Sequence, residues 1–265
     1  MRKGHVMSKL AFIFPGQGAQ KAGMGKDFYE NSEAARSFFD QAQKILDFDL
    51  KEMCFGEHEE LNLTEYTQPC MVSVCLAIVQ ELKKRGINPD ITAGLSLGEY
   101  AAVAAAGGMN ELDAIKLVRR RGILMQSTVP AGEGAMAAVL GLDAKKIEEI
   151  LESFENVWIA NYNCPGQIVI TGLTNEVQQA SLALKEAGAK RVVELKVSGP
   201  FHSLLLKPAG EALLKEMESM SFSTLQVPYV ANATAEIVTD SKKISTFFAK
   251  GIYSSVRWQQ SIETM

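Results

Sequence analysis

Short apolar runs and longer helix-like segments alternate along the first half of the chain. Strands are predicted at the two apolar runs, residues 10–14 and 91–93. Helices are predicted at residues 26–46, 65–85, 101–106 and 110–125. Pro69 is expected to break the second of these helices near its start, because proline cannot donate a backbone hydrogen bond. Strands and helices in this alternation indicate a mostly parallel sheet covered by helices.

From residue 134 onward the order of the predicted elements changes. Strands are predicted at residues 135–142, 157–162, 167–173 and 191–197, with helices at 143–154 and 174–188. Asp143 is the expected N-cap of the first helix, and Gly188 closes the second. The order β-α-β-β-α-β is that of a ferredoxin-like unit. We therefore expect an α/β-hydrolase-like large domain, made of residues 1–130 and 198–265, with a small ferredoxin-like subdomain inserted at 131–197.

Composition narrows the class of protein without deciding it. With 265 residues, 47% of them hydrophobic, the chain can bury a full core. A net charge of −4 does not favour nucleic-acid binding. The four cysteines form no C-x-x-C or Cys/His pattern, so neither a metal site nor a disulfide framework is expected. The sequence has no 18-residue apolar run and no signal peptide, which predicts a soluble cytoplasmic protein.

The most informative motif is Gly-Leu-Ser-Leu-Gly at residues 94–98, with Ser96 at its centre. It follows a predicted strand and precedes an alanine-rich helix, which is the setting of a nucleophile elbow. A sharp turn there exposes the serine, and the flanking glycines keep Cβ atoms away from neighbouring backbone. The helix start adds unpaired N–H groups and a positive partial charge. A glycine–serine turn without chemistry is the alternative interpretation.

A serine nucleophile needs a base, and the chain has only three histidines. His5 precedes a second methionine, Met7, in what looks like an extension or alternative start. His58 lies in an acidic run that predicts a solvated loop. His202 follows a predicted strand, where active-site residues are often found, and is the candidate general base. A structural role for His202 is the alternative, since the sequence does not show its distance from Ser96.

A loop rich in glycine follows the first predicted strand. Residues 15–20 read Pro-Gly-Gln-Gly-Ala-Gln, and Lys21 stands where a G-x-G-x-x-G motif would place its third glycine. A nucleotide-binding loop is therefore disfavoured. A flexible loop at the carboxyl end of a strand suits the presentation of a backbone N–H to a developing oxyanion. A plain strand-to-helix turn is the alternative.

Together these segments resemble the malonyl-CoA:acyl carrier protein transacylases, from about residue 8 to the last residue. The matching segments are residues 14–20, 94–100, 121–122, 161–167, 199–203 and 253–258. The resemblance implies transfer of malonyl from malonyl-CoA to the phosphopantetheine thiol of acyl carrier protein, by a monomer with no bound cofactor or metal. It also implies a large domain with a ferredoxin-like insertion and an active site in the cleft between them.

The resemblance assigns the steps of the reaction to particular residues. Ser96, deprotonated by His202, would attack the thioester and become malonylated. The backbone N–H groups of Gln17 and Leu97 would hold the oxyanion. The backbone carbonyl of Gly251 would orient His202.

Three further residues are implied to bind the substrate: Arg121, Phe201 and Asn161. Three consecutive arginines, 119–121, point in three directions around a helix, so at least one should face inward. A surface cluster is the commoner role, and we expect it for Arg119 and Arg120. The resemblance makes Arg121 the partner of the malonyl carboxylate, which a guanidinium binds through two parallel hydrogen bonds. Phe201 resembles the bulky residue with which related acyltransferases favour malonyl over branched groups.

The chain departs from the family pattern at several places. Leu95 stands where histidine is common, Gly251 where many members have glutamine, and Ser255 where a proline is usual, which should loosen that turn. Family members continue for some tens of residues beyond Met265. We therefore expect the chain to end early, with an uncovered sheet edge and reduced stability.

Two other function classes remain open from the sequence. A serine thioesterase or lipase would use the same elbow, although no triad acid is evident between Ser96 and His202 and Arg121 would have no purpose. An inactive acyltransferase-like docking module is the second alternative.

Overall fold

One of two four-stranded sheets, called the large sheet because it belongs to the larger body of the molecule, carries the nucleophile motif at the end of its second strand. A computed structural model describes residues 9–130, 132–197 and 199–265. His5 and Met7, and the predicted boundary residues 131 and 198, lie outside the described residues. The large sheet has the order β1-β2-β7-β8, in which β1 (Ala11–Phe14), β2 (Ile91–Gly94) and β7 (Tyr229–Val230) are parallel. β8 (Ile237–Val238) adds an antiparallel edge. The predicted parallel sheet is confirmed.

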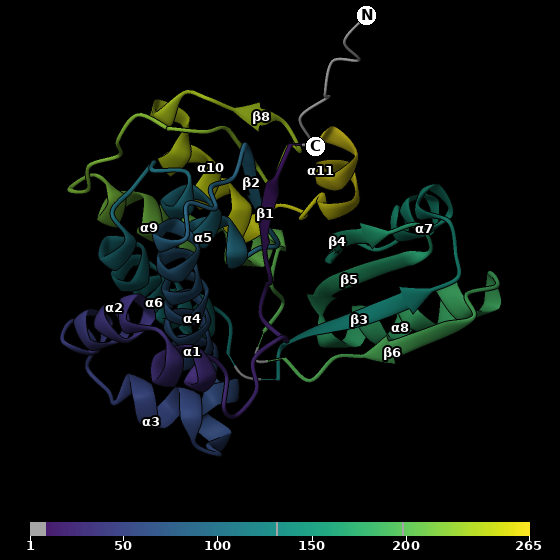
Figure 1. Cartoon of the computed structure of the whole chain (residues 1–265). Helices are drawn as coiled ribbons and strands as arrows, with labels where there is room; N and C mark the ends of the chain where they lie inside the picture. The colour runs from purple at the N-terminus through teal and green to yellow at the C-terminus, as the bar shows by residue number, and fades with distance from the viewer. Residues whose placement is uncertain (1–8, 131, 198) are drawn as a thin grey trace, which may run out of the picture.

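Helices cover this sheet and form the larger body of the molecule (Figure 1). They are α1 (Lys26–Asn31), α2 (Glu33–Gln43), α3 (Leu50–Phe55), α4 (Thr64–Lys84), α5 (Gly98–Ala105), α6 (Glu111–Thr128), α9 (Lys207–Met217), α10 (Ile244–Tyr253) and α11 (Trp258–Thr264), with 3₁₀ turns η1 (Glu59–Asn62), η2 (Leu204–Leu206) and η3 (Ser241–Lys243). No helix in the described ranges is both long and apolar enough to cross a membrane.

Two predicted helices differ from what the structure shows. The single helix expected at 26–46 is divided at Ser32, whose extended backbone ends α1 and whose hydroxyl accepts a hydrogen bond from the Ala35 N–H to begin α2. Pro69 does not break α4, which runs through it. The carbonyl that proline leaves without its helical donor is that of Glu65, and the Arg119 guanidinium donates to it at 2.8 Å.

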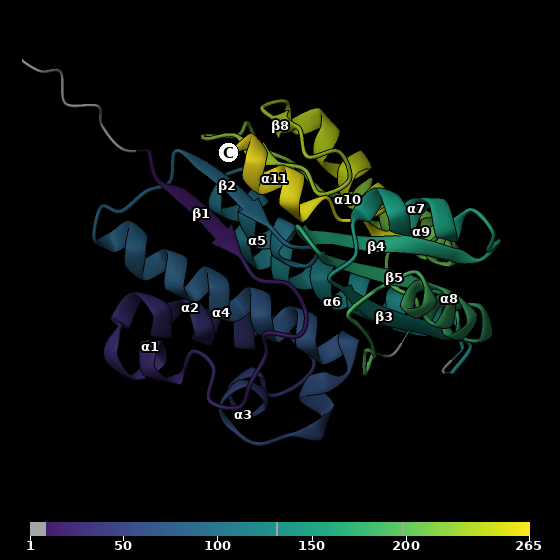
Figure 2. The ribbon, with the colours of Figure 1, turned by 90° about the vertical axis from the view of Figure 1, so that its right-hand side faces the viewer.

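The second sheet is the predicted ferredoxin-like unit. Its strands are β3 (Gly134–Leu140), β4 (Val157–Cys164), β5 (Gln167–Leu173) and β6 (Arg191–Glu194), antiparallel in the order β4-β5-β3-β6. Helices α7 (Ala144–Leu151) and α8 (Thr174–Glu186) connect them. Figures 1 and 2 show this sheet beside the larger body. The fold class is thus confirmed, while the boundaries at 131 and 197 stay a prediction.

The two faces of the small sheet pack into two different hydrophobic cores. Alternate residues such as Val139 and Ile170 pack with α7 and α8 into a core of their own. Met136 and Val169, which point the opposite way, join the core of the larger body. The face of the small sheet away from its helices therefore faces the larger body.

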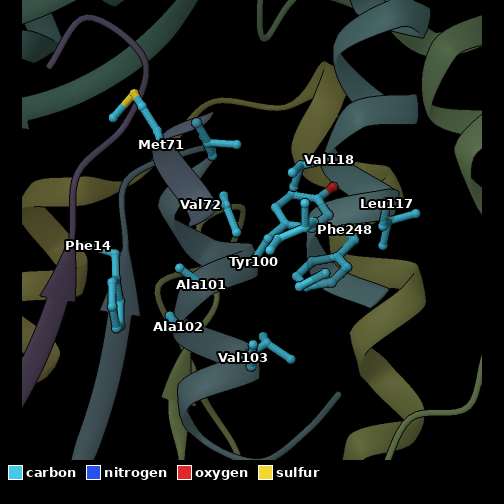
Figure 3. Packing of buried hydrophobic residues seen from close by; sticks show 14 of the residues in the cluster. Phe14, Met71, Val72, Tyr100, Ala101, Ala102, Val103, Leu117, Val118 and Phe248 are labelled. Atoms are coloured by element: carbon cyan, nitrogen blue, oxygen red, sulfur yellow. The ribbon is translucent and has the colours of Figure 1, made fainter. Parts of the chain in front are cut away.

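The helix that follows the nucleophile motif, α5, is buried in the core of the larger body. All eight residues of α5 are buried, and most are small, which lets the helix lie close to the strands and to α4 and α6. Figure 3 shows Tyr100 of α5 stacked on Phe248 of α10, with ring centroids 3.9 Å apart. This packing makes the turn before α5 a rigid platform.

Candidate active site

Ser96 occupies a tight turn between β2 and α5. Its φ is +51°, a left-handed conformation that costs a residue other than glycine about 1–3 kcal/mol. Glycines are required on both sides, since a Cβ on Gly94 would overlap the backbone of Gly98, and one on Gly98 would overlap the Phe14 carbonyl. The predicted strand, turn and helix are all present, and they hold the serine in the strained geometry of an elbow.

His202 lies against Ser96, although 106 residues separate them in the chain. Its Nε2 is 2.8 Å from Ser96 Oγ, and its Nδ1 is 2.8 Å from the Gly251 carbonyl oxygen. A carbonyl can only accept a hydrogen bond, so Nδ1 carries the proton and Nε2 is left to accept from the serine hydroxyl. Gly251 is in the last turn of α10, where carbonyls have no helical donor and are free for such a contact.

The surroundings keep His202 neutral. The side chain is 5% exposed, and burial, followed by the positive charge of Arg121, lowers its pKa to about 4, against the opposing effect of the carbonyls of Gly251 and Ser254. At neutral pH the imidazole is therefore an unprotonated base with its free nitrogen on the serine.

Arg121, in the middle of α6, reaches the same site. It is 2% exposed, its Nη2 donates to Ser96 Oγ at 3.2 Å, and its guanidinium lies over the Tyr100 ring. Its Nε is buried without a hydrogen-bond partner among the described residues. A buried cation with an unused donor is suited to an anionic ligand.

The other two arginines of the run behave differently from each other. Arg120 is exposed and ion-paired with Glu216, as expected. Arg119 is not a surface residue: its guanidinium pairs with Asp47 and Glu65, and its side chain is largely covered. The prediction for Arg119 was wrong because its direction on α6 points it at Glu65 of α4 and at Asp47 in the segment between α2 and α3.

A cavity of about 350 Å³ joins these groups, between the large sheet and the free face of the small one. Its lining includes Ser96, His202 and Arg121, and also Gln17, Phe201 and Asn161. Leu97 is buried directly after the serine, at the start of α5. The structure therefore places every residue singled out from the sequence in or beside one cavity, with Gly251 behind His202.

Asn161 faces the cavity because of an irregularity in β4. The pairing of β4 with β5 shifts register between Ile159 and Asn161. Ile159 and Tyr162 consequently pack toward α7 and α8, while Asn161 is aimed at the cavity. A bulge that re-aims a side chain in this way is common beside active sites.

Side chains that bind metals do not cluster in the described part of the chain. No group of three His, Cys, Asp or Glu side chains that could hold an ion occurs in the parts of the chain that the structure describes. His202 contacts a backbone carbonyl where a hydrolase triad has a carboxylate.

Comparison with known proteins places this geometry in a family. The acyl transferase domain family matches residues 11–265. The malonyl CoA-acyl carrier protein transacylase of Bacillus subtilis (strain 168) is 45% identical over 264 residues, 98% of this chain and 83% of the relative. This chain belongs to the malonyl CoA-acyl carrier protein transacylase family.

Solved structures of the family superpose closely on the chain. The acyl carrier protein S-malonyltransferase of Vibrio cholerae has a TM-score of 0.93 and 40% identity, covering 97% of this chain and 88% of that one. A malonyl-transacylase solved in complex with a type II PKS acyl-carrier protein has a TM-score of 0.93 and 38% identity, with 97% and 84% coverage.

Two departures from the transacylase pattern are accommodated locally. Gly251 supplies its carbonyl despite having no side chain. Ser255 donates a hydrogen bond to the Ile159 carbonyl at 2.5 Å, and Val256 exchanges backbone hydrogen bonds with Ala160 and Tyr162 of β4. Serine thus ties this turn to the small sheet through a bond that proline could not donate.

Sequence reasoning missed two buried polar residues behind the transacylase site. Asn232 follows β7, and its side chain contacts the elbow backbone. Glu99 of α5, which lay in the motif without a role, accepts from the Asn232 N–H at 3.1 Å. Burial raises the pKa of Glu99 to about 8. A polar residue at the carboxyl end of a parallel strand was the available signal for Asn232, but β7 was not predicted as a strand.

Proposed function

We propose that this chain moves a malonyl group from malonyl-CoA to the phosphopantetheine thiol of acyl carrier protein, through a malonyl ester on Ser96, and so supplies fatty acid synthesis. The observation that carries the proposal is the convergence of Ser96, a neutral His202 and a buried Arg121 in one cavity. Serine and base support acyl transfer, and the arginine supports a carboxylate-bearing acyl group.

In the first half-reaction the Ser96 proton passes to His202 Nε2 as Oγ attacks the thioester carbonyl. Hydrogen bonds from the backbone N–H groups of Leu97 and Gln17 stabilise the oxyanion that forms on the carbonyl oxygen. When the tetrahedral intermediate collapses, the carbon–sulfur bond breaks and the proton on His202 goes to the CoA sulfur. CoA leaves, and Ser96 carries the malonyl group as an ester.

Arg121 holds the far end of the malonyl group. Its guanidinium donates to Ser96 Oγ, so a carboxylate bound to Arg121 lies close to the nucleophile. Phe201 and Asn161 complete the wall around the acyl group, with Phe201 limiting its bulk.

The second half-reaction runs the same chemistry with a different thiol. The phosphopantetheine thiol of acyl carrier protein gives its proton to His202 and attacks the ester carbonyl. The proton then returns to Ser96 Oγ as the ester bond breaks, which regenerates the free enzyme and leaves malonyl on the carrier.

The test is to incubate the purified chain with malonyl-CoA, with and without acyl carrier protein, and to weigh all products. We expect malonyl on the carrier when it is present and little free malonate when it is absent. Release of malonate faster than transfer would mean a thioesterase, and no turnover with no adduct would mean a docking module. Action as a cytoplasmic monomer stays a prediction.

A further inference from the structure

One side chain from a distant part of the sequence forms two hydrogen bonds with the backbone of the nucleophile elbow. Asn232 follows β7 and is 3% exposed. Its Oδ1 accepts a hydrogen bond from the Ser96 N–H at 2.7 Å, and its Nδ2 donates to the Gly94 carbonyl at 2.7 Å. A single carboxamide thus connects the peptide groups on both sides of Leu95.

We propose that Asn232 is a positioning residue of the transfer reaction, which holds Ser96 in its left-handed conformation and at attacking distance. The inference rests on the proposed function, since it assigns a role in forming the malonyl ester. Asn232 is not part of the described cavity lining, so it acts through Ser96 and not on the substrate.

The position of Asn232 is itself fixed on two sides. Its backbone N–H donates to the Glu99 carboxyl on α5 at 3.1 Å. Its backbone carbonyl accepts from the Arg257 N–H at 2.9 Å, just before α11. The backbone of Asn232 is therefore held at two points, by α5 and by the residue before α11, and this fixes its carboxamide against the elbow.

The two contacts require an amide. Toward Ser96 the side chain must offer an acceptor, and toward Gly94 it must offer a donor, at the spacing of the two ends of one carboxamide. An aspartate would keep the first contact but set a second oxygen against the Gly94 carbonyl. An alanine would lose both.

The hydrogen bond between Asn232 and Ser96 also determines which backbone N–H groups are free to bind the substrate carbonyl. The Ser96 N–H lies at the beginning of a helix, where it would otherwise be an unpaired donor. With Asn232 Oδ1 as its partner it is withdrawn from the reacting carbonyl. The Leu97 and Gln17 N–H groups assigned to the oxyanion therefore act without competition from the serine's own amide.

The test is a rapid-quench measurement of the malonyl-enzyme by intact mass, with malonyl-CoA as the probe at increasing concentrations. Native chain, Asn232→Ala and Asn232→Asp are compared. Asn156→Ala is the matched control, because Asn156 is a partly buried amide whose side chain donates to Glu176 of α8, and neither residue lines the cavity. The amplitude counts folded molecules, and the rate constant reports the site, so partial misfolding does not hide the result.

We expect the maximal rate constant to fall about 100-fold in Asn232→Ala and about 10-fold in Asn232→Asp, because small displacements of a nucleophile have effects of this size. The malonyl-CoA concentration giving half the maximal rate should stay within about twofold of native, and Asn156→Ala should keep the native rate.

An Asn232→Ala rate within threefold of native, or a loss confined to the half-maximal concentration, would overturn the assignment. If Asn232→Ala does not fold, the Asn232→Asp rate decides in the same way. Absence of an adduct in the native chain would refute the proposed function itself, whereas a native adduct with unchanged variants refutes only the role of Asn232.

Discussion

Replacing Arg121 by alanine should convert a malonyl-selective site into one that no longer distinguishes malonyl from acetyl. Arg121 is buried, contacts Ser96 Oγ through Nη2 and has an unused Nε donor. A malonyl carboxylate gives these donors a partner of opposite charge. An acetyl group leaves the guanidinium desolvated and unpaired, which is costly.

The expected size follows from the hydrogen bonds at stake. A hydrogen bond to a charged group contributes about 1.5–3 kcal/mol, and a factor of ten in rate corresponds to about 1.4 kcal/mol. A two-bond grip therefore allows roughly 10²–10⁴-fold in kcat/KM, and solvent left in the cavity reduces it toward the lower end. We expect Arg121→Ala to lower the malonyl-to-acetyl ratio of kcat/KM by about 100-fold, mainly through loss of malonyl transfer.

The assay measures kcat/KM for malonyl-CoA and acetyl-CoA with acyl carrier protein as acceptor. Arg121→Lys should recover little, because an ammonium group lacks the planar fork. Arg120→Ala is the matched control, since that neighbouring arginine is exposed and paired only with Glu216. If the ratio in Arg121→Ala equals the native ratio, the carboxylate is bound elsewhere and this assignment of the site is wrong.

Two further predictions concern groups that titrate. His202→Ala should slow malonyl-ester formation by about 10²–10⁴-fold. In the native chain the rate of ester formation should be flat from pH 8 to about 5 and fall near pH 4, because protonation of His202 removes the base. An inflection of the native rate near pH 6.5 in rapid-quench data would contradict the lowered pKa of His202. Burial raises the pKa of Glu99 from 4.5 to about 8, so the folded chain keeps a proton that the unfolded chain releases in this range, and the free energy of unfolding should fall as pH rises from 4.5 to 8. Denaturant titrations should show a shallower fall in Glu99→Gln, and parallel curves would disprove the protonated state of Glu99.

The parts of the site that the sequence predicts are those set by local backbone chemistry. Gly94 and Gly98 on either side of Ser96 indicate an elbow, because a Cβ at either position would overlap backbone atoms. His202 could be chosen by elimination, since the chain has so few histidines. Gly251 came only from the family resemblance, because a carbonyl acceptor leaves no mark on the side-chain sequence.

The parts that escaped prediction depend on contacts between distant segments. Asn232 reaches an elbow 136 residues earlier in the chain, in a stretch with no strand-like run long enough to recognise. A surface position was predicted for Arg119 because the sequence does not show that α4 packs beside it. Asn161 faces the cavity only because a bulge shifts the register of β4, and periodicity alone would have turned it toward α7 and α8.

The predictions of a single helix at 26–46 and of a helix break at Pro69 were wrong for a related reason. Apolar spacing continues through residue 32, so periodicity favours one long helix, whereas the capping bond of the Ser32 hydroxyl favours a break. Pro69 shows the opposite case, in which a local helix breaker is tolerated because Arg119 supplies the missing donor from another helix. In both, a single hydrogen bond outweighs the pattern.

The most direct test is to map the malonyl group on the chain itself. The native protein is mixed with malonyl-CoA, quenched in acid, digested and examined by mass spectrometry, beside Ser96→Ala treated in the same way. We predict one malonyl ester, on the peptide that holds Ser96, and no adduct in the variant. A malonyl group on another residue, or an adduct that survives in Ser96→Ala, would contradict the proposed mechanism.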